Sequence, residues 1–132
     1  MAITLTHAGL TLQLSDRLDW TDEFSWSPVQ QSKDYALGGE LIVGVALKQA
    51  GRPITLESEA TKAWITRADC DTLRAWAALP DIELDLVLRG VTRAVMFDHE
   101  RGGFTARPVW VLLDGEVYSQ QLYLPTLRFF EV

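Results

Sequence analysis

Cysteine is almost absent from this chain of 132 residues, since Cys70 is the only one. A lone cysteine excludes an internal disulfide and a metal centre built from several thiolates. Long apolar stretches are also missing: the longest, residues 41–47, is interrupted by Gly44 and is far shorter than the ~20 residues of a membrane-spanning helix. The sequence does not open on a basic segment followed by an apolar one, so we expect no secretory signal peptide. These absences favour a protein that is made in a reducing cytoplasm and stays out of the membrane.

Positive charge is scarce as well. The sequence has 12 Lys and Arg and 18 Asp and Glu, which gives a net charge of −6 and a pI near 4.8. Nonspecific binding to nucleic acid or to an anionic membrane needs a cationic surface, so neither is expected to be the main task. Hydrophobic residues make up 48% of the chain, which excludes a disordered protein. The length fits one domain over residues 1–132, because single cores typically hold roughly 100–200 residues.

Apolar residues recur mostly with a period of two, which predicts a mainly β fold. The clearest hairpin joins residues 82–88 to residues 91–97 through Arg89 and Gly90, whose turn type the sequence leaves open. Pro125 lies in the last strand segment, where it favours an edge position or a bulge. The other expected strands cover residues 3–14 with a bend at Gly9, residues 35–47 with a bulge or tight bend at Gly38 and Gly39, and residues 54–56, 109–113 and 117–132.

One segment follows a helical period instead and predicts a helix over about residues 67–79. Thr66 is placed as an N-cap, with the acidic Asp69 three residues later. Cys70, Leu73 and Trp76 then recur on one side at helical spacing, so this side should pack on the sheet.

Residues 16–34 form the least regular part of the chain. They are polar but include Trp20, Phe24 and Trp26. These rings either belong to a long loop that folds back on its own sheet or to an arm that docks on a neighbouring subunit, where aromatic anchors contribute most of the binding energy.

Catalytic patterns are missing, so we expect no enzyme, no catalytic or metal-binding residue and no cofactor. Asp98, His99 and Glu100 are consecutive and cannot all point at one ion from a strand. Cys70 lies where a helix N-terminus could activate a thiol, but its place on the apolar side of the helix favours a buried, inert group. No nucleophile elbow or phosphate-binding glycine loop occurs.

Two alternatives remain open from the residues alone. A small monomeric β-barrel module could cup a ligand, with Trp64, Trp110 and Tyr123 as its walls. A cryptic enzyme would centre on His99, with Asp98 or Glu100 as its partner.

Several spaced phrases, taken together, resemble small tail-tip and baseplate proteins of long-tailed bacteriophages, with the distal tail protein as the first choice. A tail completion or terminator protein, or a tube subunit, is the next alternative. The resemblance covers most of the chain, and its phrases are residues 26–32 (WSPVQQS), 39–45 (GELIVGV), 51–56 (GRPITL), 64–76 (from Trp64 to Trp76) and 122–132 (LYLPTLRFFEV).

The resemblance implies a β-barrel or β-sandwich with one packed helix, which assembles as a ring of identical copies, often a hexamer. Neighbouring subunits of such rings pair strands, and the ring contacts other tail proteins of the tube and the hub. The expected place is the virion tail, after synthesis in the host cytoplasm. Genomic DNA would pass through the ring without specific binding, and an acidic subunit suits such a channel because a negative lumen repels phosphates. The subunit interface is assigned to Trp20, Phe24 and Trp26 in the arm and to Arg101 and Phe104 in a second loop.

Overall fold

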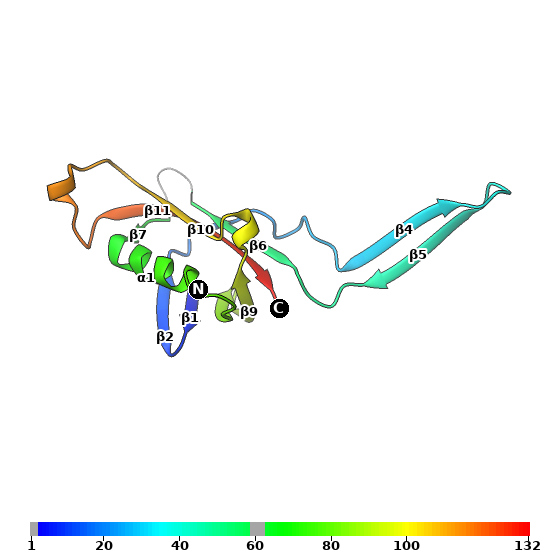
Figure 1. Cartoon of the computed structure of the whole chain (residues 1–132), viewed down its shortest axis with the longest axis horizontal. Helices are drawn as coiled ribbons and strands as arrows, with labels where there is room; N and C mark the ends of the chain where they lie inside the picture. The colour runs from blue at the N-terminus through cyan, green and yellow to red at the C-terminus, as the bar shows by residue number, and fades with distance from the viewer. Residues whose placement is uncertain (1–2, 59–62) are drawn as a thin grey trace.

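An antiparallel sheet of nine strands forms the body of the molecule in the computed structural model, and a separate two-stranded sheet projects from it (Figure 1). The structure describes residues 3–58 and 63–132. The large sheet has the order β2-β1-β8-β9-β11-β6-β3, and β10 and β7 also pair with β11. Its strands are β1 (Ile3–His7), β2 (Leu10–Leu14), β3 (Asp19–Trp20), β6 (Pro53–Glu57), β7 (Ile65–Thr66), β8 (Leu84–Leu88), β9 (Val91–Phe97), β10 (Phe104–Pro108) and β11 (Leu122–Glu131).

The expectation of a mainly β fold with one packed helix is confirmed. Within residues 3–58 and 63–132 the sheet does not close into a barrel, because β2 and β3, at the two ends of the strand order, do not pair. Leu5, Leu86 and Phe129 are fully buried in the core, and they come from β1, β8 and β11.

Two tight hairpins are each closed by a pair of residues with positive φ. Ala8 and Gly9 connect β1 to β2, and Arg89 and Gly90 connect β8 to β9. Positive φ at both central residues is the requirement of a type I′ turn, whose twist matches the flanking strands. The predicted hairpin over residues 82–97 is therefore confirmed. Gly9 belongs to a full chain reversal, not to a bend within one strand.

The long strand β11 is the centre of the body, since strands pair along both of its edges. β9 and β10 follow one edge, and β6 and β7 follow the other. Pro125 lies opposite Ala106 of β10, and its carbonyl accepts a hydrogen bond from the Ser58 hydroxyl on the other edge. Because N–H and C=O of one strand residue point to the same side, the missing N–H of Pro125 lies on the side of Ser58, beyond the end of β6.

The helix α1 (Arg67–Ala77) begins where the sequence predicts it and ends two residues earlier. The Thr66 side chain accepts a hydrogen bond from the Asp69 backbone N–H at 3.4 Å, which confirms the N-cap. Cys70, Leu73 and Trp76 are its buried residues, as expected from their spacing. No helix of the described residues is long and apolar enough to cross a membrane.

The segment between β10 and β11 differs from the prediction. Residues 109–113 do not form a strand, and a short 3₁₀ helix, η2 (Asp114–Glu116), follows them. A second one, η1 (His99–Arg101), connects β9 to β10. The strand predicted over residues 117–132 begins only at Leu122.

Candidate interaction surface

The arm, defined here as residues 29–47, is an antiparallel hairpin that projects from one end of the body (Figure 1). It consists of β4 (Val29–Tyr35) and β5 (Leu41–Leu47). Ala36 donates its N–H to the Glu40 carbonyl at 2.8 Å to close the turn. Every residue of both strands is exposed, and none belongs to the core.

The two faces of the arm differ in polarity. Residues that are directly opposite each other in an antiparallel pair share a face, and the register places Tyr35 opposite Leu41 and Lys33 opposite Val43. One face is therefore largely apolar, and Lys33 is its only charged side chain. We call it the apolar face of the arm; its members are Val29, Gln31, Lys33, Tyr35, Leu41, Val43, Val45 and Leu47. The opposite face carries Gln30, Ser32, Asp34, Ile42, Gly44 and Ala46.

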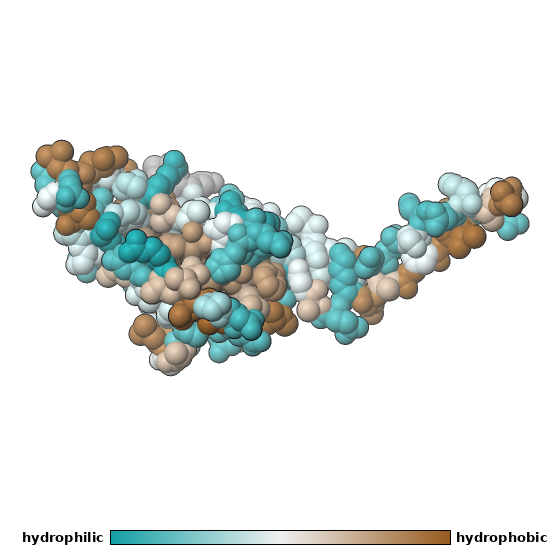
Figure 2. Space-filling view, viewed as in Figure 1, coloured by the Kyte–Doolittle hydropathy of each residue, from teal (hydrophilic) through white to brown (hydrophobic). Residues whose placement is uncertain are grey.

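The exposure of the apolar face is high for large side chains. Val45 is 63% exposed, Leu47 is 67% exposed and Tyr35 is 77% exposed. Hydrophobic residues, coloured brown, also recur along the lower edge of the arm in Figure 2. The largest apolar patch of a typical monomer covers about 300–600 Å² and is often functional.

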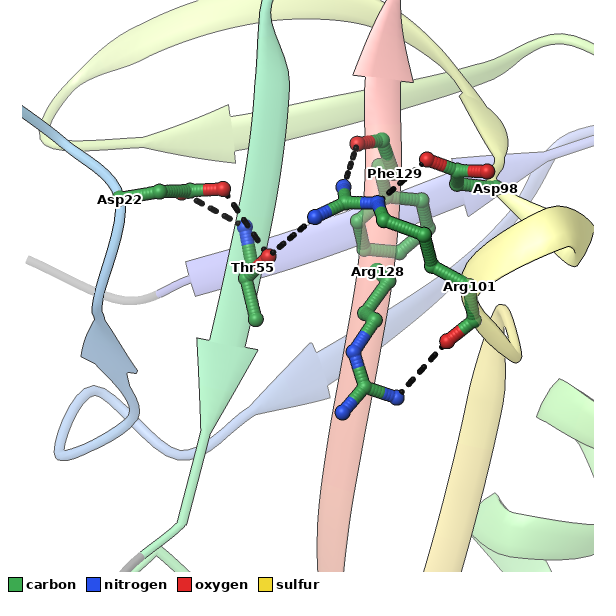
Figure 3. Close-up of polar contacts among 6 residues, drawn as sticks. All are labelled: Asp22, Thr55, Asp98, Arg101, Arg128 and Phe129. Atoms are coloured by element: carbon green, nitrogen blue, oxygen red, sulfur yellow. Dashed lines mark hydrogen bonds and ion pairs between the residues drawn. The ribbon is translucent and has the colours of Figure 1, made fainter. Parts of the chain in front are cut away.

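Hydrogen bonds anchor the root of the arm, which we define as residues 20–28 before it and residues 48–52 after it, to the body. Both carboxylate oxygens of Asp22 accept hydrogen bonds from Thr55 on β6, one from its N–H and one from its hydroxyl, each at 2.9 Å (Figure 3). Arg52, which follows the arm, donates to the Glu23 carbonyl at 2.8 Å. Asp22 thus ties the chain that enters the arm to the sheet, and Arg52 ties the chain that leaves the arm to the chain that enters it.

Trp20 lies in the core and is not an interface residue, which corrects the assignment made from the sequence. It is 5% exposed and pairs with Leu56 through β3. The guanidinium carbons of Arg52 and Arg93 lie 4.9 and 5.1 Å from the centre of the indole, in cation–π geometry. The indole ring therefore anchors the root of the arm within its own subunit. This role explains why an otherwise polar segment contains a tryptophan.

Arg101 is also engaged within the subunit. Its guanidinium donates to the Asp98 carboxylate at 2.6 Å, to the Thr55 hydroxyl at 3.3 Å and to the Phe129 carbonyl at 3.4 Å (Figure 3). Its own carbonyl accepts a hydrogen bond from Arg128 at 3.0 Å. These contacts give the side chain a structural role in joining η1 to β6 and β11, which the sequence did not reveal.

The remaining interface candidates lie in different surroundings. Phe24 is 93% exposed at the root of the arm, whereas Trp26 is half-buried with the Lys48 ammonium 5.3 Å from its ring centre. Phe104 is half-buried against the core. The projecting segment shares only residues 29–34 with the predicted arm over 16–34. The apolar run over residues 41–47, next to the polar residues 30–34, was the signal that could have located the apolar face.

A second apolar surface lies at the opposite end of the molecule from the arm (Figures 1 and 2). We call residues 109–118 the end loop. Its exposed large side chains are Trp110, Val111, Leu113 and Tyr118. Val111 is 88% exposed and Leu113 is 73% exposed. The Gln121 amide holds the base of this loop by donating to the Trp110 carbonyl at 3.3 Å.

The groups considered for catalysis lie at two separate places, since Cys70 lines a hollow beside the helix and the other three residues line another hollow. Asp98, His99 and Glu100 line an open hollow of about 500 Å³, but the Asp98 carboxylate is bound by Arg101. Burial, followed by the charges of Asp69 and Asp71, raises the pKa of the Cys70 thiol to about 11. Cys70 is buried, and burial with a raised pKa favours the interpretation of an inert thiol over that of an activated one.

The walls of the suggested ligand module do not converge on the hollow that lies beside the helix. This hollow, of about 280 Å³, is lined by Tyr123 together with Arg67 and Phe104, and by neither Trp64 nor Trp110. Both tryptophans are almost half exposed. In the described part of the chain, no three His, Cys, Asp or Glu side chains are grouped so that they could hold a metal ion.

Comparison of the chain with protein-family models, with curated proteins and with solved structures gave no match.

Proposed function

We propose that this chain is a structural subunit of a bacteriophage tail, which assembles with copies of itself into a ring and makes its main subunit contact through the arm. The observation that carries this proposal is the apolar face of the arm, which no other part of the described chain covers. A large, contiguous apolar patch on a soluble protein marks a surface that another molecule covers.

The physical chemistry of a two-stranded hairpin supports the same conclusion. An isolated hairpin is at best marginally stable in water, because it has no core and both of its edges are open. The described residues pair β4 only with β5, so the outer edges of both strands are free to accept a strand from a neighbour. Contact with a second subunit would bury the apolar side chains and satisfy these backbone groups.

The assignment to a phage tail rests on the resemblance of the spaced sequence phrases. Two of them, residues 26–32 and 39–45, belong to the arm and its root, and residues 122–132 contain the central strand β11. In the proposed ring the subunit lies at the end of the tail tube, contacts tube and hub proteins, and surrounds the path of the DNA. The net charge of −6 suits that path, because it disfavours binding to phosphates.

The contact through the arm is tested by adding charge to its apolar face. Leu41→Glu combined with Val45→Glu should convert the assembled protein to a monomer, because two carboxylates would have to be buried without partners. The mass in solution is measured by light scattering, and rings are counted by electron microscopy. Gln30→Glu combined with Ser32→Glu places the same charge on the opposite face and should leave assembly unchanged.

Assembly of the Leu41→Glu, Val45→Glu protein at the wild-type level would contradict this role of the arm, as would a wild-type chain that stays monomeric at high concentration. The tail assignment has its own test, which is co-expression with the products of the neighbouring genes. We expect co-purification with tube and hub proteins. Homo-oligomers that retain no tail protein would contradict the tail assignment and leave self-assembly in place.

A further inference from the structure

Each copy of this chain carries two exposed apolar surfaces, and they lie at opposite ends of an elongated molecule (Figure 2). The apolar face of the arm is at one end, and the end loop, residues 109–118, is at the other. A subunit of this shape cannot cover one of its surfaces with the other. A second copy can, and it supplies both surfaces in equal number.

From this arrangement we infer that the apolar face of the arm binds the end loop of the next copy, so that subunits join head to tail. The inference rests on the proposed function and specifies its partner surface. A head-to-tail contact is heterologous, and repeated contacts of this kind close into a ring when the rotation between copies allows it.

The charges of the two surfaces complement each other. Lys33 is the only charged side chain on the apolar face of the arm. The end loop carries Asp114 and Glu116, and residues 109–121 contain no Lys or Arg. Opposite charges at the two surfaces favour this pairing and steer the encounter.

The same charges disfavour contact between two arms through their apolar faces. In a symmetric contact each Lys33 would be buried beside apolar side chains and near its own copy, without an anion. In the head-to-tail contact each Lys33 approaches the acidic residues of the end loop.

Both surfaces offer large, exposed apolar side chains to a contact, among them Tyr35 and Leu47 on the arm and Val111 and Leu113 in the end loop. Trp110 and Tyr118 supply aromatic anchors, and such residues are enriched among those that dominate binding energy.

The test uses two variants that each disable one surface. The arm variant is Leu41→Glu with Val45→Glu, and the end-loop variant is Val111→Glu with Leu113→Glu. Each alone should weaken self-association by roughly a hundredfold and leave monomers. Mixed in equal amounts, they should form a one-to-one dimer of twice the 14.8 kDa mass, because one intact arm and one intact end loop remain between them.

Native mass spectrometry of the mixture gives the result, and circular dichroism of each variant shows that it is folded. Ala75→Glu with Thr92→Glu, two exposed sites of the body, is the matched control and should assemble as the wild type does. An end-loop variant that assembles normally overturns the inference while the arm keeps its proposed role. Two monomeric variants whose mixture stays monomeric also overturn it. An arm variant that assembles normally overturns the proposed function as well.

Discussion

At the scale of single residues, the side chains around the root of the arm show how the body holds a projecting element. Asp22 binds the N–H and the hydroxyl of Thr55, and Thr55 also accepts a hydrogen bond from Arg101. Trp20 lies beneath Arg52 and Arg93 in cation–π contact. Aromatic and charged residues that could belong to a subunit interface instead stabilise the subunit itself.

Removal of the Asp22 carboxylate should therefore destabilise the body. Asp22→Ala leaves the N–H and the hydroxyl of Thr55, which is 6% exposed, without this acceptor. We expect a loss of about 1–3 kcal/mol in the free energy of unfolding. Urea denaturation measures it, with Asp16→Ala at an exposed site as the control. Equal stability of the two variants would show that the Asp22 hydrogen bonds contribute nothing.

Cys70 should react slowly in the folded protein. Its pKa is raised from 9.0 to about 11, chiefly by burial. At pH 8 the folded protein therefore holds roughly a hundredfold less thiolate than the unfolded chain. We expect alkylation by iodoacetamide to be at least that much slower in buffer than in urea. Equal rates would contradict the buried, protonated thiol.

The same raised pKa gives a dependence of stability on pH. As the pH rises, the unfolded chain loses the Cys70 proton before the folded protein does. The contribution of this group to the free energy of unfolding is therefore complete below pH 9.0 and is lost towards pH 11. Cys70→Ala should remove this part of the decline in the free energy of unfolding between pH 9.0 and about 11, as measured by urea denaturation at each pH.

At the scale of elements, strands with similar local patterns differ in their burial. β8 and β5 are both rich in apolar residues, yet Leu84, Leu86 and Leu88 are buried while Leu41, Val43 and Val45 are exposed. β8 is paired with β1 and β9 within the large sheet, whereas β5 is paired only with β4 among the described strands. The difference lies in the elements that surround the strand.

Because the arm contributes nothing to the core, the body should fold without it. The Lys48 N–H binds the Pro28 carbonyl at 2.7 Å, so the two chains are already adjacent at the base. Replacing residues 29–47 by an Asn-Gly dipeptide would close this pair with a type I′ turn. We expect a monomer whose melting temperature lies within a few degrees of that of the monomeric arm variant.

Calorimetry measures the melting temperature, and light scattering measures the mass in solution. The control is Leu37→Gly, which changes only the turn of the arm and keeps both strands. An unfolded product of the excision would contradict the independence of the body from the arm. A product that still forms rings would contradict the role of the arm in assembly.

At the scale of the whole molecule, shape and charge are compatible with the proposed assembly into a ring. The molecule is acidic and elongated, and its two exposed apolar surfaces lie at opposite ends (Figures 1 and 2). If the two surfaces bind each other in successive copies, as inferred above, the contacts are heterologous and can close into a ring.

The sequence by itself determined the local structure of this protein. The period of two in residues 82–97 and the Arg89-Gly90 pair specified a hairpin, and Thr66 specified the start of α1. These features were predictable because each depends on backbone preferences within a few residues.

Only the tertiary structure decided which side chains are buried and which are free to bind. Trp20 is buried because β6 and two arginines surround it, Arg101 is engaged because β11 passes beneath η1, and Val45 is exposed because no third strand or helix of the described chain covers the arm. Burial depends on contacts between residues far apart in sequence, and no local pattern contains them.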